Sequence, residues 1–125
     1  MTAQGQGLAD LLEVTNAGGV RVVAFRKPVD LTADGVPECR PALDAHARDA
    51  TAMVLDLGNV RFMDSAGIGT VVVLQRTLLR GGGELRLARP SREVAAVFEL
   101  LRLHRLLEIH ATVDEAVASF AEGFA

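Results

Sequence analysis

The sequence predicts an α/β fold in which helices pack mainly on one face of a mixed β-sheet of four to five strands. Two observations lead to this expectation. Strand-like and helix-like segments alternate along the chain, and two strand-like segments open it as a hairpin. The chain has 125 residues, half of them hydrophobic, which is enough for one domain with its own core. We therefore expect a single domain over residues 10–125, preceded by a flexible N-terminus over residues 1–9.

The opening hairpin is expected from two short segments that are rich in aliphatic side chains, Leu11–Thr15 and Val20–Phe25. Residues 16–19 between them read Asn-Ala-Gly-Gly. Asparagine and glycine accept the positive φ angles of a tight turn, so these residues can join two antiparallel strands.

The stretch from Arg26 to about Ala50 is less regular. Its alanines favour a helix, whereas Pro37 and Pro41 cannot lie inside a helix without cost. A helix that begins near Glu38, with Pro41 still in its first turn, satisfies both observations.

The centre of the chain predicts a strand, a loop and a long helix. Met53–Leu57 is a short apolar run typical of a buried central strand. A loop is expected from Val60 to Ser65, and a helix over Ala66–Arg80. The spacing of apolar residues places one face of this helix in the core: Ile68, Val71, Val72, Leu78 and Leu79.

The last third of the chain continues the alternation. Gly81–Gly83 is expected to end the long helix, and Glu84–Ala88 alternates as a strand does. Ser91 is expected to cap a helix, and Leu107–His110 to form a short edge strand. The buried positions of the Ser91 helix are expected to be Val94, Val97, Phe98 and Leu101.

A final helix is expected after Thr112, which forms a capping box with Glu115. Its inward-facing residues are expected to be Val113, Ala116, Val117 and Phe120.

Composition and charge argue against several classes of protein. The net charge is −3, from 16 acidic and 13 basic residues, which disfavours direct nucleic-acid binding and a polybasic membrane anchor. The single cysteine, Cys39, cannot form an intramolecular disulfide or a cysteine-rich zinc site. The first residues do not have the pattern of a signal peptide, and no apolar run is long enough for membrane insertion. We expect a cytoplasmic protein that needs no cofactor.

The most informative segment is residues 54–69, with the sequence VLDLGNVRFMDSAGIG. A strand leaves the sheet and the chain enters a helix at Asp64-Ser65, which is where functional groups gather in open α/β sheets. Ser65 is expected at or next to the N-cap, with its hydroxyl near solvent. Gly67 and Gly69 leave the first turn bare, so another molecule can approach closely. From the residues alone, ordinary helix capping by Ser65 is the favoured explanation of this segment.

This segment resembles the hallmark of STAS domains, and among them of the small standalone anti-sigma factor antagonists. The hallmark is an apolar strand ending in Asp-Leu, then a loop, then Asp-Ser-(Ser/Thr)-Gly-(Leu/Ile)-Gly. Here these are Val54–Leu57 and residues 64–69, DSAGIG, and the element order around them also fits, over about residues 10–122. The resemblance implies the STAS fold and a regulatory binding protein rather than an enzyme.

The resemblance also implies a switch. Ser65 aligns with the family's regulatory phosphorylation site. The implied partner is an anti-sigma factor with serine kinase activity, which the unphosphorylated antagonist binds so that a sigma factor is freed. Phosphorylation ends this binding, and a PP2C-type phosphatase reverses it. The residues expected to contact the partner are Asp30, Met63, Asp64, Ser65, Ala66, Gly67, Ile68 and Gly69.

Three positions depart from the family's usual pattern. Ala66 replaces a serine or threonine, which leaves a single hydroxyl in the motif. Lys27-Pro28 replaces a common Gly-Glu, and Leu101-Arg102-Leu103 replaces a common Thr-Gly-Leu. The last two bear on partner identity and on recognition by the kinase.

Other functions stay open. An enzyme using Ser65 as nucleophile would need a positioned base, and no Gly-x-Ser-x-Gly elbow is present. A STAS adaptor or scaffold subunit, for example of a lipid-transport or signalling complex, would use Ser65 only as a cap. A nucleotide-binding STAS module is a further alternative, but this sequence contains no recognisable phosphate-binding loop. His46, His104 and His110 lack metal-ligand spacing, and a monomer or weak homodimer is expected.

Overall fold

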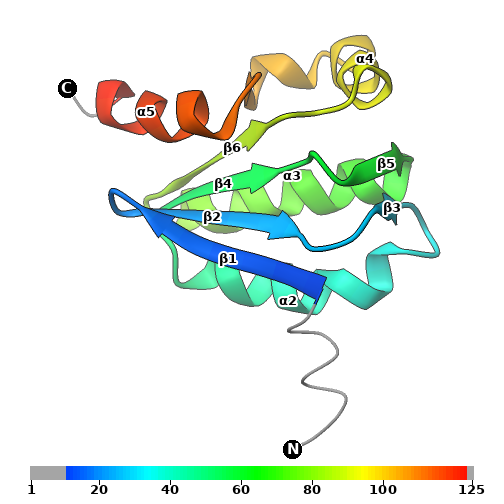
Figure 1. Ribbon diagram of the computed structural model, residues 1–125, viewed down its shortest axis with the longest axis horizontal. Coiled ribbons are helices and arrows are strands. Elements are labelled where there is room, and N and C mark those ends of the chain that lie inside the picture. The colour runs from blue at the N-terminus through cyan, green and yellow to red at the C-terminus, as the bar shows by residue number, and fades with distance from the viewer. Residues whose placement is uncertain (1–10, 124–125) are drawn as a thin grey trace, which may run out of the picture.

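The computed structural model describes residues 11–123, so the expectation of a flexible segment at residues 1–9 lies outside the described residues. A five-stranded mixed sheet forms its centre (Figure 1), as the sequence predicts. The first two strands are antiparallel, and all other neighbours in this sheet are parallel. In spatial order the strands are β1 (Leu12–Ala17), β2 (Val20–Phe25), β4 (Ala52–Asp56), β6 (Glu84–Ala88) and β7 (Glu108–His110).

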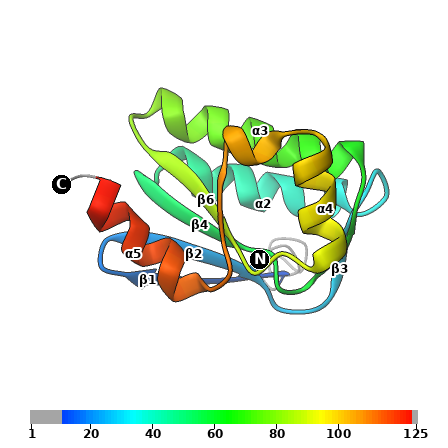
Figure 2. The ribbon, with the colours of Figure 1, turned by 90° about the horizontal axis from the view of Figure 1, so that it is seen from above.

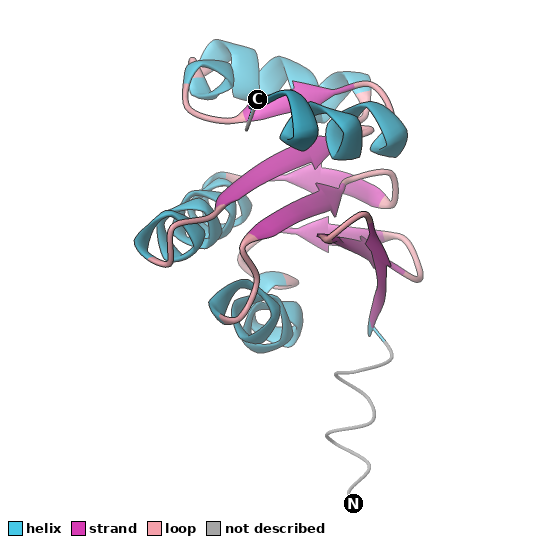
Figure 3. Cartoon of the chain, turned by 90° about the vertical axis from the view of Figure 1, so that its left-hand side faces the viewer, coloured by secondary structure: helices cyan, strands magenta, loops and turns pink. Residues whose placement is uncertain are grey.

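Helices cover both faces of the sheet unequally. The long helices α2 (Val36–Arg48) and α3 (Ser65–Arg80) lie side by side on one face and enclose the larger part of the core. The shorter α5 (Val113–Gly123) covers the other face over a smaller apolar cluster that includes Val54 and Phe120. Figures 2 and 3 show this arrangement, with α3 and α5 on opposite sides of the strands.

The turn and cap signals in the sequence are confirmed. Gly18 and Gly19 join β1 to β2 with φ angles of +59° and +84°. After α3, Gly82 has a φ of +83° and the N–H of Gly83 donates to the Leu78 carbonyl at 2.8 Å. The Ser91 hydroxyl accepts from the N–H of Val94 at 3.1 Å, at the start of α4 (Arg92–Leu100).

A second, two-stranded parallel sheet corrects the expectation of a loop from Val60 to Ser65. Residues of this loop form β5 (Val60–Met63), which pairs with β3 (Val29–Leu31) in the stretch that the sequence left irregular. Strands of three and four residues are too short to display an alternating pattern. They are held by pairing that is distant in sequence, for example by the hydrogen bond from the Val29 N–H to the Asn59 carbonyl.

Helix α2 begins at Val36 rather than near Glu38, so Pro41 lies inside the helix and not in its first turn. Pro37 instead takes a first-turn position, where its missing N–H costs nothing. The hydrogen bond lost at Pro41 is offset because the helix buries four side chains against the sheet: Val36, Cys39, Leu43 and Ala47.

The expected buried face of α3 is wrong in part. Val71 and Leu78 are buried, but Leu79 is exposed, and Leu74 and Gln75 are buried instead. Gln75 can be buried because its side-chain amide exchanges two hydrogen bonds with the backbone of Leu85. On α4, Val94 and Phe98 are buried as expected, whereas Leu101 lies past the helix end and is exposed.

No helix within residues 11–123 combines the length and the apolar character that crossing a membrane requires.

Candidate functional site at the start of helix α3

Asp64, not Ser65, caps helix α3. One carboxylate oxygen of Asp64, Oδ1, accepts hydrogen bonds from the N–H groups of Ala66 at 2.8 Å and Gly67 at 3.3 Å. The other, Oδ2, accepts from the N–H of Ala33 at 3.1 Å. The Asp64 N–H donates to the Leu31 carbonyl at 3.2 Å. Asp64 therefore both starts the helix and ties it to the segment that follows β3.

Ser65 is the first residue of α3 and is exposed. Its hydroxyl makes no hydrogen bond to any residue of the 11–123 range. No base within this range is therefore placed to activate Ser65 as a nucleophile. The sequence placed Ser65 at or next to the N-cap, and the structure places it next to the cap. Its hydroxyl is thus free of a structural task at the helix start.

The two glycines of the motif have different surroundings. Gly67 is buried, and a Cβ at this position would lie 2.1 Å from the Leu31 carbonyl oxygen and 2.7 Å from Cγ of Met63. Its small size is therefore needed inside the protein, where α3 passes over β3. Gly69 is exposed and has open space around it. Only Gly69 fits the expectation of a bare surface.

The remaining motif residues lie at the border of the surface. Met63, Ala66 and Ile68 are half-buried and pack against the core with one side. Together with Asp64, Ser65 and Gly69 they surround the start of α3, whereas the expected contact residue Gly67 lies beneath them. That these residues contact a partner stays a prediction.

Asp30, the distant member of the expected site, lies on β3 beside β5. Its carboxylate accepts two hydrogen bonds from the Arg61 guanidinium, at 3.1 Å and 3.3 Å. Both side chains are substantially exposed, so the pair contributes little to stability. The pairing of β3 with β5 brings Asp30 close in space to the strand that leads into Asp64.

Sequence reasoning missed Phe62. This residue lies on β5, two positions before Asp64, and 62% of it is exposed. A hollow of about 160 Å³ beside it is lined by residues of β5 and by Val94 and Val97 of α4. An aromatic side chain is ordinarily expected in the core, and alternation would place Phe62 on the same face as the buried Val60, so no local signal in the sequence indicates its exposure.

Charge at this site favours the ionised form of Asp64. Partial dehydration of the carboxylate raises its pKa, but the N–H groups of Ala33, Gly67 and Ala66 together outweigh this and hold the pKa below its usual value. The start of α3 therefore carries a fixed negative charge next to the Ser65 hydroxyl.

Other candidate groups lie elsewhere. Asp56, at the end of β4, has a structural role, because its carboxylate accepts a hydrogen bond from the N–H of Gly58 at 2.9 Å. Burial raises the pKa of the Cys39 thiol and keeps it protonated. Within residues 11–123 no three histidine, cysteine or carboxylate side chains gather where they could hold a metal ion.

The STAS domain family matches residues 12–116. The chain belongs to this family. It is 32% identical over 63 residues to a Thermotoga maritima protein whose provisional name is anti-sigma factor antagonist. That match covers 50% of this chain and 56% of the other protein, so this chain matches only about half the length of its curated relative.

Solved STAS structures share the fold. A STAS domain protein from Planctomyces limnophilus has a TM-score of 0.78 at 21% identity, covering 88% of this chain and 97% of the other. The anti-sigma factor antagonist SpoIIAA in its unphosphorylated form has a TM-score of 0.70 at 23% identity, covering 89% and 96%. The Bacillus SpoIIAA structure in the phosphorylated form has a TM-score of 0.64 at 22% identity, covering 87% and 98%.

Proposed function

We propose that this protein is an anti-sigma factor antagonist. Unphosphorylated, it binds an anti-sigma factor that is also a serine kinase, and so frees a sigma factor. Phosphorylation of Ser65 ends this binding, and a PP2C-type phosphatase restores it. The protein acts in the cytoplasm through other proteins, without contacting nucleic acid, performing catalysis itself or inserting into a membrane.

One observation carries the proposal: the Asp64 carboxylate caps α3, which leaves the exposed Ser65 hydroxyl free. Because no cap hydrogen bond depends on the Ser65 hydroxyl, a phosphate can be added there without removing a contact of the fold. Membership of the STAS family and the existence of a phosphorylated form of the structurally similar SpoIIAA support the same function.

The proposed switch acts on the docking surface rather than on the fold. A phosphoserine adds about −1.5 to −2 charges near pH 7. Asp64 already occupies the N–H groups of Ala66 and Gly67, so the phosphate stays exposed beside an existing negative charge. A partner docked there must bury or displace this charge. Weakening the complex a thousandfold requires only about 4 kcal/mol.

The proposed docking surface consists of the exposed and half-buried residues around the start of α3, with Phe62 added as an aromatic contact. Aromatic side chains contribute disproportionately to protein interfaces. The residues are Phe62, Met63, Asp64, Ser65, Ala66, Ile68 and Gly69, with Asp30 at the edge.

The experiment begins with Ser65→Ala as bait, because this form cannot be released by phosphorylation. The captured anti-sigma factor is then incubated with wild-type protein and ATP, and the phosphate is mapped by mass spectrometry. We expect a single phosphate on Ser65, and none in Ser65→Ala. Ser91→Ala serves as the matched control, since Ser91 also begins a helix, and it should be labelled like wild type.

The alternative of a non-switching STAS adaptor predicts a different result. Ser65 then stays unmodified in protein isolated from cells, as judged by phosphate-affinity electrophoresis. A kinase partner that leaves Ser65 unlabelled, or labels another residue, contradicts the proposed function.

A further inference from the structure

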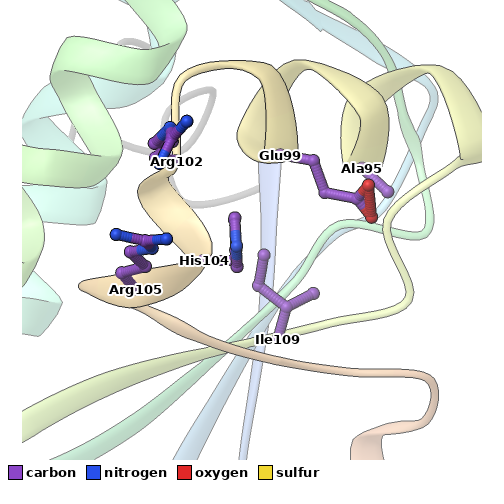
Figure 4. Close-up of a pocket in the computed structure, with 6 residues that line it drawn as sticks. All are labelled: Ala95, Glu99, Arg102, His104, Arg105 and Ile109. Carbon is purple, nitrogen blue, oxygen red and sulfur yellow. The ribbon is translucent and has the colours of Figure 1, made fainter.

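A second surface lies at the end of α4, apart from the start of α3. Here α4 is followed by the short 3-10 helix η1 (Leu103–Arg105), which leads to β7. A hollow of about 750 Å³ lies between them (Figure 4). It is lined by Ala95, Glu99, Arg102, His104, Arg105 and Ile109. None of these residues belongs to the surface proposed around Ser65.

Three exposed leucines are sequence neighbours of residues that line this hollow. Leu100 is 81% exposed, Leu106 70% and Leu101 53%. Three of the five large hydrophobic residues that are exposed within residues 11–123 thus fall in seven consecutive positions. Clusters of exposed apolar residues mark interaction sites more often than single ones do.

Positive charge accompanies the leucines. Arg102 and Arg105 are exposed, and neither makes an ion pair with any residue of the described range. In Figure 4 both lie at one end of the hollow, whereas the Glu99 side chain extends toward Ala95 at the other end. This is a local positive charge on a chain whose net charge is −3.

Arg102 also has an unusual backbone. Its φ is +58°, in the left-handed region that favours glycine. A non-glycine residue in such a conformation is strained, and strain of this kind is concentrated at functional sites. The side chain of Arg102 thus occupies a position where glycine would fit the backbone better.

We propose that residues 99–106 form a second docking surface, which binds a segment of a partner protein that carries acidic and leucine-type side chains. The leucines supply apolar contact, and Arg102 and Arg105 pair with the carboxylates of the segment. This surface acts beside the proposed Ser65 switch and contributes to partner choice.

Two other occupants fit the observations less well. A second copy of the chain, paired through the same residues about a two-fold axis, brings one glutamate and two arginines from each copy, so positive charge is left unpaired. An anionic membrane gains only modest attraction from two arginines and is opposed by the net negative charge.

The test uses a fluorescein-labelled amphipathic peptide of roughly 15 residues, with leucines on one face and glutamates beside them. Fluorescence anisotropy measures its binding to the full chain. We expect binding that weakens with rising salt, and at least a tenfold loss in a double variant carrying Arg102→Glu and Arg105→Glu. A double variant carrying Arg48→Glu and Arg76→Glu is the control, because both arginines are exposed and the net charge is matched.

Further measurements separate this proposal from the switch. Ser65→Glu should bind the peptide like wild type, so the two proposals fail independently. A peptide with lysines in place of the glutamates should not bind. The proposal is overturned if both peptides bind equally, or if both double variants bind alike. It is likewise overturned if the same arginine changes abolish self-association or binding to anionic phosphatidylserine vesicles instead.

Discussion

Asp64 accepts a hydrogen bond from the backbone N–H of Ala33, 3.1 Å away, with the carboxylate oxygen that does not cap α3. One side chain therefore holds the start of α3 against the connection between β3 and α2. Ser65, its neighbour, takes no part in these contacts within the described chain. The single hydroxyl of the motif is thus held at the surface by contacts to which it does not contribute.

Alanine substitutions should separate the two residues. Ser65→Ala should change the free energy of unfolding by no more than about 0.5 kcal/mol, as for an ordinary surface residue. Asp64→Ala should lower stability clearly, because the N–H groups of Ala33, Ala66 and Gly67 lose their acceptor. Urea denaturation measures both. Ser91→Ala serves as the reference variant, because loss of a capping serine is expected to lower the free energy of unfolding by about 1 kcal/mol.

The two motif glycines should respond oppositely to alanine. Gly67→Ala places a methyl group 2.1 Å from the Leu31 carbonyl oxygen, so α3 must move and the protein should lose several kcal/mol of stability. Gly69→Ala meets no atom within 4 Å and should stabilise the helix by up to about 1 kcal/mol. Thermal denaturation of both variants checks this. Equal effects would mean that the close contact between α3 and β3 is absent.

Acid should remove the contribution of Asp64. Its pKa is lowered in the folded protein, so ionised Asp64 stabilises the fold above the unfolded-state pKa, for which the ordinary value is 3.8. This contribution is lost as the pH falls through the lower, folded-state pKa. The stability difference between wild type and Asp64→Asn should therefore shrink below about pH 4. A difference that grows on acidification would contradict the assigned direction.

Arg86 should behave as a packing residue as much as a charge. It is buried beneath α5, donates to the Ser119 hydroxyl at 2.6 Å, pairs with Glu84 and Glu108, and lies 4.3 Å above the Phe120 ring. Arg86→Met keeps much of the volume and should cost about 1 kcal/mol, because the partner carboxylates remain partly solvated. Arg86→Ala should cost about 2–3 kcal/mol. Calorimetry compares the two.

Relief of strain at Arg102 should be measurable without any partner. Arg102→Gly suits the φ of +58° and should raise stability by up to about 1 kcal/mol. Arg102→Val should lower it, since a β-branched residue tolerates this conformation least. Thermal denaturation compares the two variants with wild type.

Local signals in the sequence were sufficient for most of the fold. The Gly18-Gly19 turn, the glycine stop after Arg80 of α3 and the Ser91 cap depend on backbone angles and hydrogen bonds between neighbours, which residue type specifies. The predictions that were wrong concern features that depend on contacts between residues distant in sequence. The pairing of β3 with β5, and the burial of Gln75 by the backbone of Leu85, have no local signature.

At the candidate site, too, local features could be predicted from the sequence and features that depend on distant contacts could not. The motif placed Ser65 at the helix start, but only the structure assigns the cap to Asp64 and places Gly67 beneath the surface. The exposure of Phe62 depends on which side of a four-residue strand is covered by α4, so a short alternating pattern could not establish it.

The proposed switch requires that phosphate on Ser65 changes binding and not folding. The most direct measurement compares protein carrying genetically encoded phosphoserine at position 65 with the unmodified protein. Affinity for the captured anti-sigma factor and thermal unfolding are measured on the same samples. We predict an affinity loss of about a thousandfold with a nearly unchanged unfolding temperature. Equal affinities, or a phosphorylated chain that no longer folds, would contradict the account.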